Sequence, residues 1–113
     1  MSTELYIDRK TVLLIKDIVR LEGTGNYTKI FAREGKSFTS SKTLKTLAAE
    51  LPELPDFIRI NKTHLINAGY ITGYQYDMGG DGKKFLVVSM TDGSSLIVSR
   101  NRELALRRLL TNT

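Results

Sequence analysis

The sequence predicts a mostly β domain of antiparallel strands, with one internal helix and a second helix at the C-terminal end. Short apolar or β-branched segments, separated by glycine-containing turns, fill most of the 113 residues. The pair Asp92-Gly93 has the composition of a tight hairpin turn. Leucines at helical spacing occur in two segments, so we expect one domain over residues 1–113 with few helices.

The first third of the chain is rich in strand-forming residues. Lys16-Asp17 separates two aliphatic runs, and the cluster at residues 23–26 tolerates positive φ and favours a turn. Glu34-Gly35-Lys36 is typical of a hairpin tip. The strands predicted here cover residues 12–15, 18–22, 27–33 and 37–39.

The period of the apolar residues changes after Ser40 and Ser41. Serine side chains can accept hydrogen bonds from the free N–H groups at a helix start. Proline lacks a backbone N–H and disfavours helical geometry in the residue before it, so prolines end helices. We therefore expect an internal helix that contains Leu44, Leu47, Ala48 and Leu51 and that Pro52 and Pro55 close.

The second half returns to strands and ends in a helix. Residues 57–60 and 65–67 are apolar and flank a polar connection, Asn61-Lys62-Thr63-His64. Residues 70–76, 84–91 and 95–98 are predicted as an antiparallel meander, with a glycine-rich loop at 79–82. The final helix, 99–110, has Ser99 as a candidate N-cap, and its amphipathic pattern sets Leu106, Leu109 and Leu110 opposite Arg100 and Arg107.

Composition excludes several functional classes. No run is long and apolar enough to span a bilayer and the N-terminus lacks a secretory signal, so we expect a cytoplasmic protein without membrane contact. The absence of cysteine excludes disulfides and thiolate metal ligands. With one histidine, His64, and no carboxylate pair in a setting that would separate the two pKa values, we expect no enzyme activity, no metal and no cofactor.

The glycine-rich run Gly79-Gly80-Asp81-Gly82-Lys83-Lys84 is predicted as a hairpin loop. A phosphate-binding loop would need GxxxxGK[ST] spacing and a following helix N-terminus, whereas a strand follows here. Asp77 and Asp81 are too few acidic residues for an EF-hand calcium loop.

Charge favours a polyanionic partner. Seventeen Lys and Arg against twelve Asp and Glu give a net charge of +5 and a pI near 9.6. Arg and Lys pair with guanine edges and Asn pairs with adenine, and such residues form three clusters: Asn26 and Tyr27 with Lys29; Lys62, Thr63 and His64; Arg100, Asn101 and Arg102. The alternative is that these side chains are ordinary solvent-exposed surface residues. They indicate a binding site if the fold brings the three clusters to one side of the molecule.

The ordered elements resemble a LytTR domain, a DNA-binding output module of bacterial response regulators. The likeness is carried by DIVRLE at 17–22 with Asn26-Tyr27, by SKTL through residue 51, by FIRINKTHLIN at 57–67 and by VSRNR at 98–102. Together these segments cover roughly residues 10 to 110. The resemblance implies an elongated stack of small antiparallel β-sheets, whose loops enter successive major grooves on one face of bent DNA, usually at direct repeats bound by two copies.

Carried over by position, the resemblance assigns the groove-reading residues. These are Asn26 and Tyr27 with Lys29 close by, Lys62 and Thr63 in the middle connection, and Arg100, Asn101 and Arg102 before the last helix. Arg59 and His64 flank the middle connection and are expected at phosphates. Asn61 and Lys62 stand where the family more often has His and Arg, and Lys lacks the bidentate guanidinium fork, so the base preference of this loop stays open.

We therefore expect a transcription regulator that binds specific double-stranded DNA, in a bacterial two-component setting and with a second copy on the DNA. The alternative is a protein-interaction module whose loops bind an acidic signalling partner. An RNA-binding domain is disfavoured because RRM and KH signatures are absent. The family usually attaches this domain to a phosphorylated receiver, so the chain is either a free-standing regulator controlled by its amount or a partner protein, or a C-terminal piece of a longer one.

Overall fold

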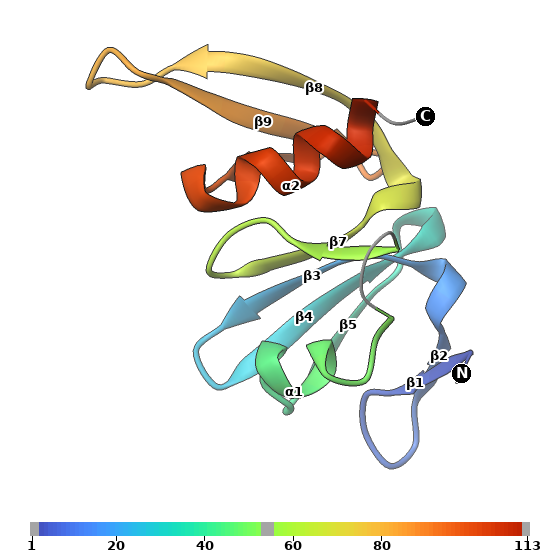
Figure 1. The fold of residues 1–113 in the computed structure, drawn as a ribbon. Coiled ribbons are helices and arrows are strands. Elements are labelled where there is room, and N and C mark those ends of the chain that lie inside the picture. The colour runs from blue at the N-terminus through green and yellow to red at the C-terminus, as the bar shows by residue number, and fades with distance from the viewer. Residues whose placement is uncertain (1–2, 53–55, 112–113) are drawn as a thin grey trace.

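Three antiparallel β-sheets are stacked in an elongated molecule (Figure 1). The computed structural model describes residues 3–52 and 56–111, and its principal dimensions are 47 × 32 × 24 Å. The sheets contain two, five and three strands, and helix α2 packs beside the three-stranded one. The predicted fold class, mostly β with two helices and several small antiparallel sheets, is confirmed.

The elements follow one another with short connections. The strands are β1 (Glu4–Tyr6), β2 (Val12–Leu14), β3 (Ile18–Thr24), β4 (Tyr27–Ala32), β5 (Ser37–Ser40), β6 (Phe57–Arg59), β7 (His64–Asn67), β8 (Ile71–Met78), β9 (Lys84–Met90) and β10 (Ser95–Val98). The helices are α1 (Leu44–Ala48) and α2 (Arg100–Thr111), and short 3₁₀ turns cover Ile15–Asp17, Arg33–Gly35 and Ala68–Tyr70.

The central sheet, in the order β5-β4-β3-β7-β6, separates two hydrophobic cores. Because side chains alternate along a strand, its two faces carry different residues. On one face, Leu21 and Leu65 pack with α1 and the β1–β2 hairpin. On the other, Val19 and Ile66 pack with the β10-β9-β8 sheet and with Leu106 of α2, which is fully buried.

A β-bulge in β3 decides where Arg20 points. The register of β3 against β4 shifts between Ile18 and Arg20. An extra residue in a strand moves the following side chains relative to the face they would otherwise occupy. Arg20 consequently pairs with Ile66 of the second core and lies on the face that meets the three-stranded sheet.

The N-terminal hairpin and the internal helix differ from the sequence-based expectation. Strand β1 was not predicted because it has three residues and depends on pairing with β2. The internal helix was expected to start after Ser40 and Ser41, but it has five residues and Thr43 caps it, accepting a hydrogen bond from the Thr46 N–H. Ser40 instead belongs to β5, where its buried hydroxyl donates to the Ile7 carbonyl; the predicted role of Pro55 lies outside the described residues.

The start of the last helix also needs correction. Arg100 is the first residue of α2, so Arg100, Asn101 and Arg102 lie in its first turn and not in a loop before it. Ser99 precedes the helix, and its hydroxyl contacts the Ile60 carbonyl and Asn101 Oδ1 in place of the expected N-cap bond. Within residues 3–52 and 56–111, no helix has the length and apolar content to cross a membrane.

Candidate nucleic-acid interface

The three clusters singled out in the sequence lie at one end of the molecule, which we call the loop end. The β3–β4 turn, the β6–β7 loop and the first turn of α2 all lie on the left side of the view in Figure 1, away from both termini. Hydrogen bonds join these segments directly. The Gly23 N–H donates to the Thr63 carbonyl at 2.8 Å, and the Ser99 N–H donates to the Ile60 carbonyl at 2.8 Å.

The β3–β4 turn presents Asn26 and Tyr27 to solvent. Gly25 adopts a φ of 60°, which side chains other than glycine rarely tolerate, so the turn can be this tight. Asn26 and Tyr27 are exposed, and Tyr27 keeps 40% of its surface accessible. Lys29 is two residues further along β4, exposed and directly opposite Glu22 of β3.

Asn61 builds the β6–β7 loop. Its Oδ1 accepts from the Thr63 N–H at 2.8 Å and from the His64 N–H at 2.9 Å, which is the Asx-turn arrangement. Its Nδ2 donates to the Ile97 carbonyl of β10 at 2.7 Å, so the same side chain ties the loop to the three-stranded sheet. Lys62 and Thr63 are left exposed at the loop apex.

Arg59 and His64 support this loop from within. The Arg59 guanidinium donates through Nε to the Asn61 carbonyl at 3.0 Å and through Nη2 to the Lys62 carbonyl at 2.6 Å. His64 Nε2 lies 3.1 Å from Glu22 Oε1, and its Nδ1 lies 3.0 Å from Thr63 Oγ1. Both side chains therefore have partners inside the protein in this structure.

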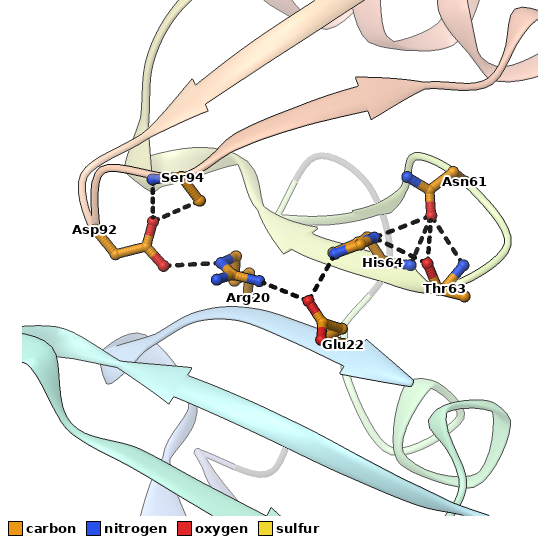
Figure 2. A network of polar contacts seen from close by, with 7 residues as sticks. All are labelled: Arg20, Glu22, Asn61, Thr63, His64, Asp92 and Ser94. Atoms are coloured by element: carbon orange, nitrogen blue, oxygen red, sulfur yellow. Dashed lines mark hydrogen bonds and ion pairs between the residues drawn. The ribbon is translucent and has the colours of Figure 1, made fainter. Parts of the chain in front are cut away.

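The contact of His64 with Glu22 belongs to a longer polar network (Figure 2). The Glu22 carboxylate is 3.4 Å from Nη1 of Arg20, and Nε of Arg20 is 2.8 Å from the carboxylate of Asp92 in the β9–β10 turn. The Arg20 guanidinium also lies 3.7 Å from the centre of the Phe31 ring, a cation–π contact. The network thus runs from the β9–β10 turn across β3 to the β6–β7 loop.

Asp92 is held in its charged form. Burial raises the pKa of Asp92, but hydrogen bonds from the Ser94 hydroxyl and from the Arg20 guanidinium outweigh it and bring the pKa below the ordinary value of 3.8. A low pKa keeps this carboxylate ionised at neutral pH, so its pairing with Arg20 persists.

The first turn of α2 supplies three further polar side chains. Arg100, Asn101 and Arg102 are exposed. Nη2 of Arg100 forms an ion pair with Asp81 of the β8–β9 hairpin at 3.2 Å. Arg102 and Arg59 both line a cleft of about 340 Å³ between α1, β6 and α2, so the last helix and the edge strand β6 contribute cations to the same region.

All ten predicted site residues therefore belong to one end of the molecule or to its immediate supports. The sequence analysis did not identify the residues that hold the loops in place, namely Asn61, Arg20 and Asp92. The Asn-x-Thr spacing of Asn61 was an available turn signal. Nothing local marks Arg20 and Asp92, because they are 72 positions apart and meet only after β3 and the three-stranded sheet have packed.

The side chains at the loop end are suited to contacts with a nucleic acid. Among residues 3–52 and 56–111, no group of three or more His, Asp or Glu side chains is placed to hold a metal ion. The loop end combines cations, amides and a tyrosine on one surface, which is the set of groups that contact phosphates and base edges in nucleic acids.

Comparison with known proteins identifies the family and the fold. A family model described as the LytTr DNA-binding domain matches residues 8–111. Over 107 residues the chain is 29% identical to the heme-containing CO-sensing transcriptional regulator RcoM 1 of Paraburkholderia xenovorans (strain LB400); this match covers 94% of the chain and 38% of that protein. The fold matches the LytTr DNA-binding domain of a Bacillus cereus protein assigned as a methyl-accepting/DNA response regulator, with a TM-score of 0.73, 22% identity and coverage of 96% of this chain and 94% of that one.

Proposed function

The chain belongs to the LytTR family of DNA-binding domains found in transcription regulators, and from that premise we propose that it reads specific double-stranded DNA with the loop end described above. The observation that carries the proposal is the convergence of three clusters, far apart in sequence, at one end of the fold. The bonds Gly23–Thr63 and Ser99–Ile60 join the segments that carry them. These bonds fix the three clusters relative to one another, as contact with one shared ligand requires.

The proposal divides the polar residues into readers and supports. The readers are the exposed side chains at the tips or within two residues of them: Asn26, Tyr27, Lys29, Lys62, Thr63, Arg100, Asn101 and Arg102. Arg59 and His64 hold the β6–β7 loop through the Lys62 carbonyl and through Glu22. We propose this supporting role for them in place of the phosphate contact that the sequence suggested.

Lysines and arginines supply most of the affinity through phosphates, and fewer side chains supply base choice. Arg102 has the planar fork that pairs with guanine, and Asn26 and Asn101 have the amide that pairs with adenine. Lys62 brings a point charge to its loop. If about five phosphates are neutralised, the logarithm of the binding constant falls with the logarithm of salt concentration at a slope of about −4 to −5.

We propose that these loops enter two successive major grooves. Grooves on one face of B-DNA recur every 34–36 Å or so. The β3–β4 turn and the first turn of α2 come from different layers of the stack, with the β6–β7 loop between them in Figure 1. Two copies on direct repeats would extend the same contact along the DNA.

The domain would act as the DNA-binding output of a bacterial signalling protein. Both similar proteins carry regulatory names, one a CO-sensing transcriptional regulator and the other a response regulator. The chain spans 38% of the length of the first.

The test is selection of a binding site from a random pool. The purified chain is titrated into labelled duplexes with a randomised centre at near-physiological salt, and the bound fraction is sequenced. Enrichment of one short motif, repeated at about one helical turn, supports the proposal. Binding that stays unselective and vanishes with added salt contradicts it and favours an acidic protein partner.

Matched variants locate the readers on the selected site. Arg102→Ala is compared with Arg108→Ala, which removes the same charge from an exposed position near the other end of α2. Loss of a base contact costs about 1–3 kcal/mol and relaxes choice at one position. An equal and small loss in both variants would mean that Arg102 contributes charge alone.

A further inference from the structure

The hairpin between β8 and β9 lies beside the proposed DNA surface. In Figure 1 its tip extends on the same side as the β3–β4 turn and the β6–β7 loop, and it projects beyond the start of α2. The ion pair between Asp81 and Arg100 joins the tip to the first turn of α2. The tip thus neighbours a residue that we propose as a DNA reader.

The tip has a defined shape. The Gly79 N–H donates to the Lys83 carbonyl at 2.8 Å, and the Gly82 N–H donates to the Gly79 carbonyl at 3.0 Å. Asp81 Oδ1 accepts from the Lys83 N–H at 3.0 Å. A Cβ on Gly79 would approach Asp81 Oδ1 to 2.9 Å, so glycine at this position allows the aspartate to fold over the turn.

Asp81 uses both carboxylate oxygens inside the protein. The Lys83 N–H holds Oδ1, and the Arg100 guanidinium lies 3.2 Å from Oδ2. The Lys83 N–H and, next, the Arg100 guanidinium lower the pKa of Asp81 below 3.8, so the group stays ionised and its charge is met locally. The negative charge of Asp81 is therefore directed at the hairpin and at Arg100.

The remaining charge at the tip is positive and accessible. Lys83 and Lys84 are exposed, and in the described part of the chain neither forms an ion pair. Gly80 and Gly82 have no side chain to keep a ligand from the backbone, and an added Cβ on either would meet nothing within 4 Å. A polyanion could therefore approach both lysine ammonium groups and the backbone between the strands.

We propose that the β8–β9 hairpin tip is a further phosphate-binding element, in which Lys83 and Lys84 contact the DNA backbone next to the groove entered by the first turn of α2. The Asp81–Arg100 ion pair, at 3.2 Å between two half-exposed side chains, links the tip to that turn. This inference rests on the proposed DNA-binding function. The hairpin tip would increase the affinity for DNA and help to set the position of the protein on the duplex. It would not add base preference, because phosphate contacts carry no direct sequence information.

The experiment measures the salt dependence of binding to the selected duplex for the double variant Lys83→Ala/Lys84→Ala. The control is Lys16→Ala/Lys36→Ala, which removes the same charge from exposed lysines at the opposite end of the central sheet. We expect the slope of log K against log salt to become shallower by about 1–2 in the hairpin variant and to stay unchanged in the control. The base preference of the hairpin variant should equal that of the unaltered chain.

A second substitution separates charge from shape. Lys83→Arg/Lys84→Arg keeps both charges and should retain the original slope. Equal slopes for the hairpin and control alanine variants would overturn the inference. A shallower slope for the arginine variant, with unchanged thermal unfolding, would overturn it as well. Absence of any selected motif for the unaltered chain would instead contradict the proposed function itself, so the two failures are distinguishable.

Discussion

Replacing Asn61 by alanine should destabilise the domain by about 2–3 kcal/mol. The substitution removes the bond to the Ile97 carbonyl and the acceptor shared by the Thr63 and His64 N–H groups. Each such bond contributes about 1 kcal/mol net, so the loss of these three bonds accounts for the expected change. In a domain of this size, that loss lowers the melting temperature by about 10 °C.

Urea unfolding followed by circular dichroism measures the effect, with two comparison variants. Asn101→Ala makes the same chemical change at an exposed position in the first turn of α2 and should stay within about 0.5 kcal/mol of the unaltered chain. Asn61→Asp keeps the acceptor for the loop N–H groups but loses the donor to Ile97, so its stability should fall between the two. A loss below about 0.5 kcal/mol for Asn61→Ala would refute the role of this side chain as the organiser of the loop.

Two further predictions concern the second core and the ion-pair network. Leu106→Ala should lower the free energy of unfolding by about 3 kcal/mol because Leu106 is fully buried. Leu104→Ala, on the exposed side of α2, should change it by less than about 0.5 kcal/mol. Similar values for both variants would contradict the observed orientation of the helix. Because bonds from Ser94 and Arg20 hold the pKa of Asp92 below 3.8, its contribution to stability is present above that pH and is lost as the pH falls through the lower value of the folded state. Unfolding titrations from pH 7 to pH 2 should therefore show a smaller acid-induced loss for Asp92→Asn than for the unaltered chain, and parallel curves would exclude this carboxylate as a source of the acid sensitivity.

Local signals accounted for most of the strands. The Asp92-Gly93 turn, the glycine-containing turn before Tyr27 and the β-branched runs in β3 and β9 each dictate conformation within a few residues. Strand β1 and the length of α1 escaped prediction because they depend on partners. A three-residue strand exists only when paired, and Ser40 lies in β5 with its hydroxyl bonded to the Ile7 carbonyl, so Thr43 caps the helix instead.

The candidate site shows the same division. Its polar clusters were visible in the sequence because Asn, Lys and Arg are the residue types that contact bases and phosphates, and because the segments that carry them resemble those of LytTR domains. Whether a given side chain is free to contact DNA was not visible. Arg59 and Arg102 are both arginines near apolar strand or helix residues, yet one holds the Lys62 carbonyl and the other is exposed.

The sequence alone determined the class of fold, the positions of the turns and the chemistry available at them, because backbone propensity and side-chain type act over a few residues. Tertiary structure decided that three turns share one end of the molecule, that Asn61 and the Arg20 network hold the middle loop, and that the β8–β9 hairpin stands beside α2. These relations join residues up to 72 positions apart. They follow from the register of the strands and from the stacking of the sheets on two hydrophobic cores, and neither of these is set by a local segment.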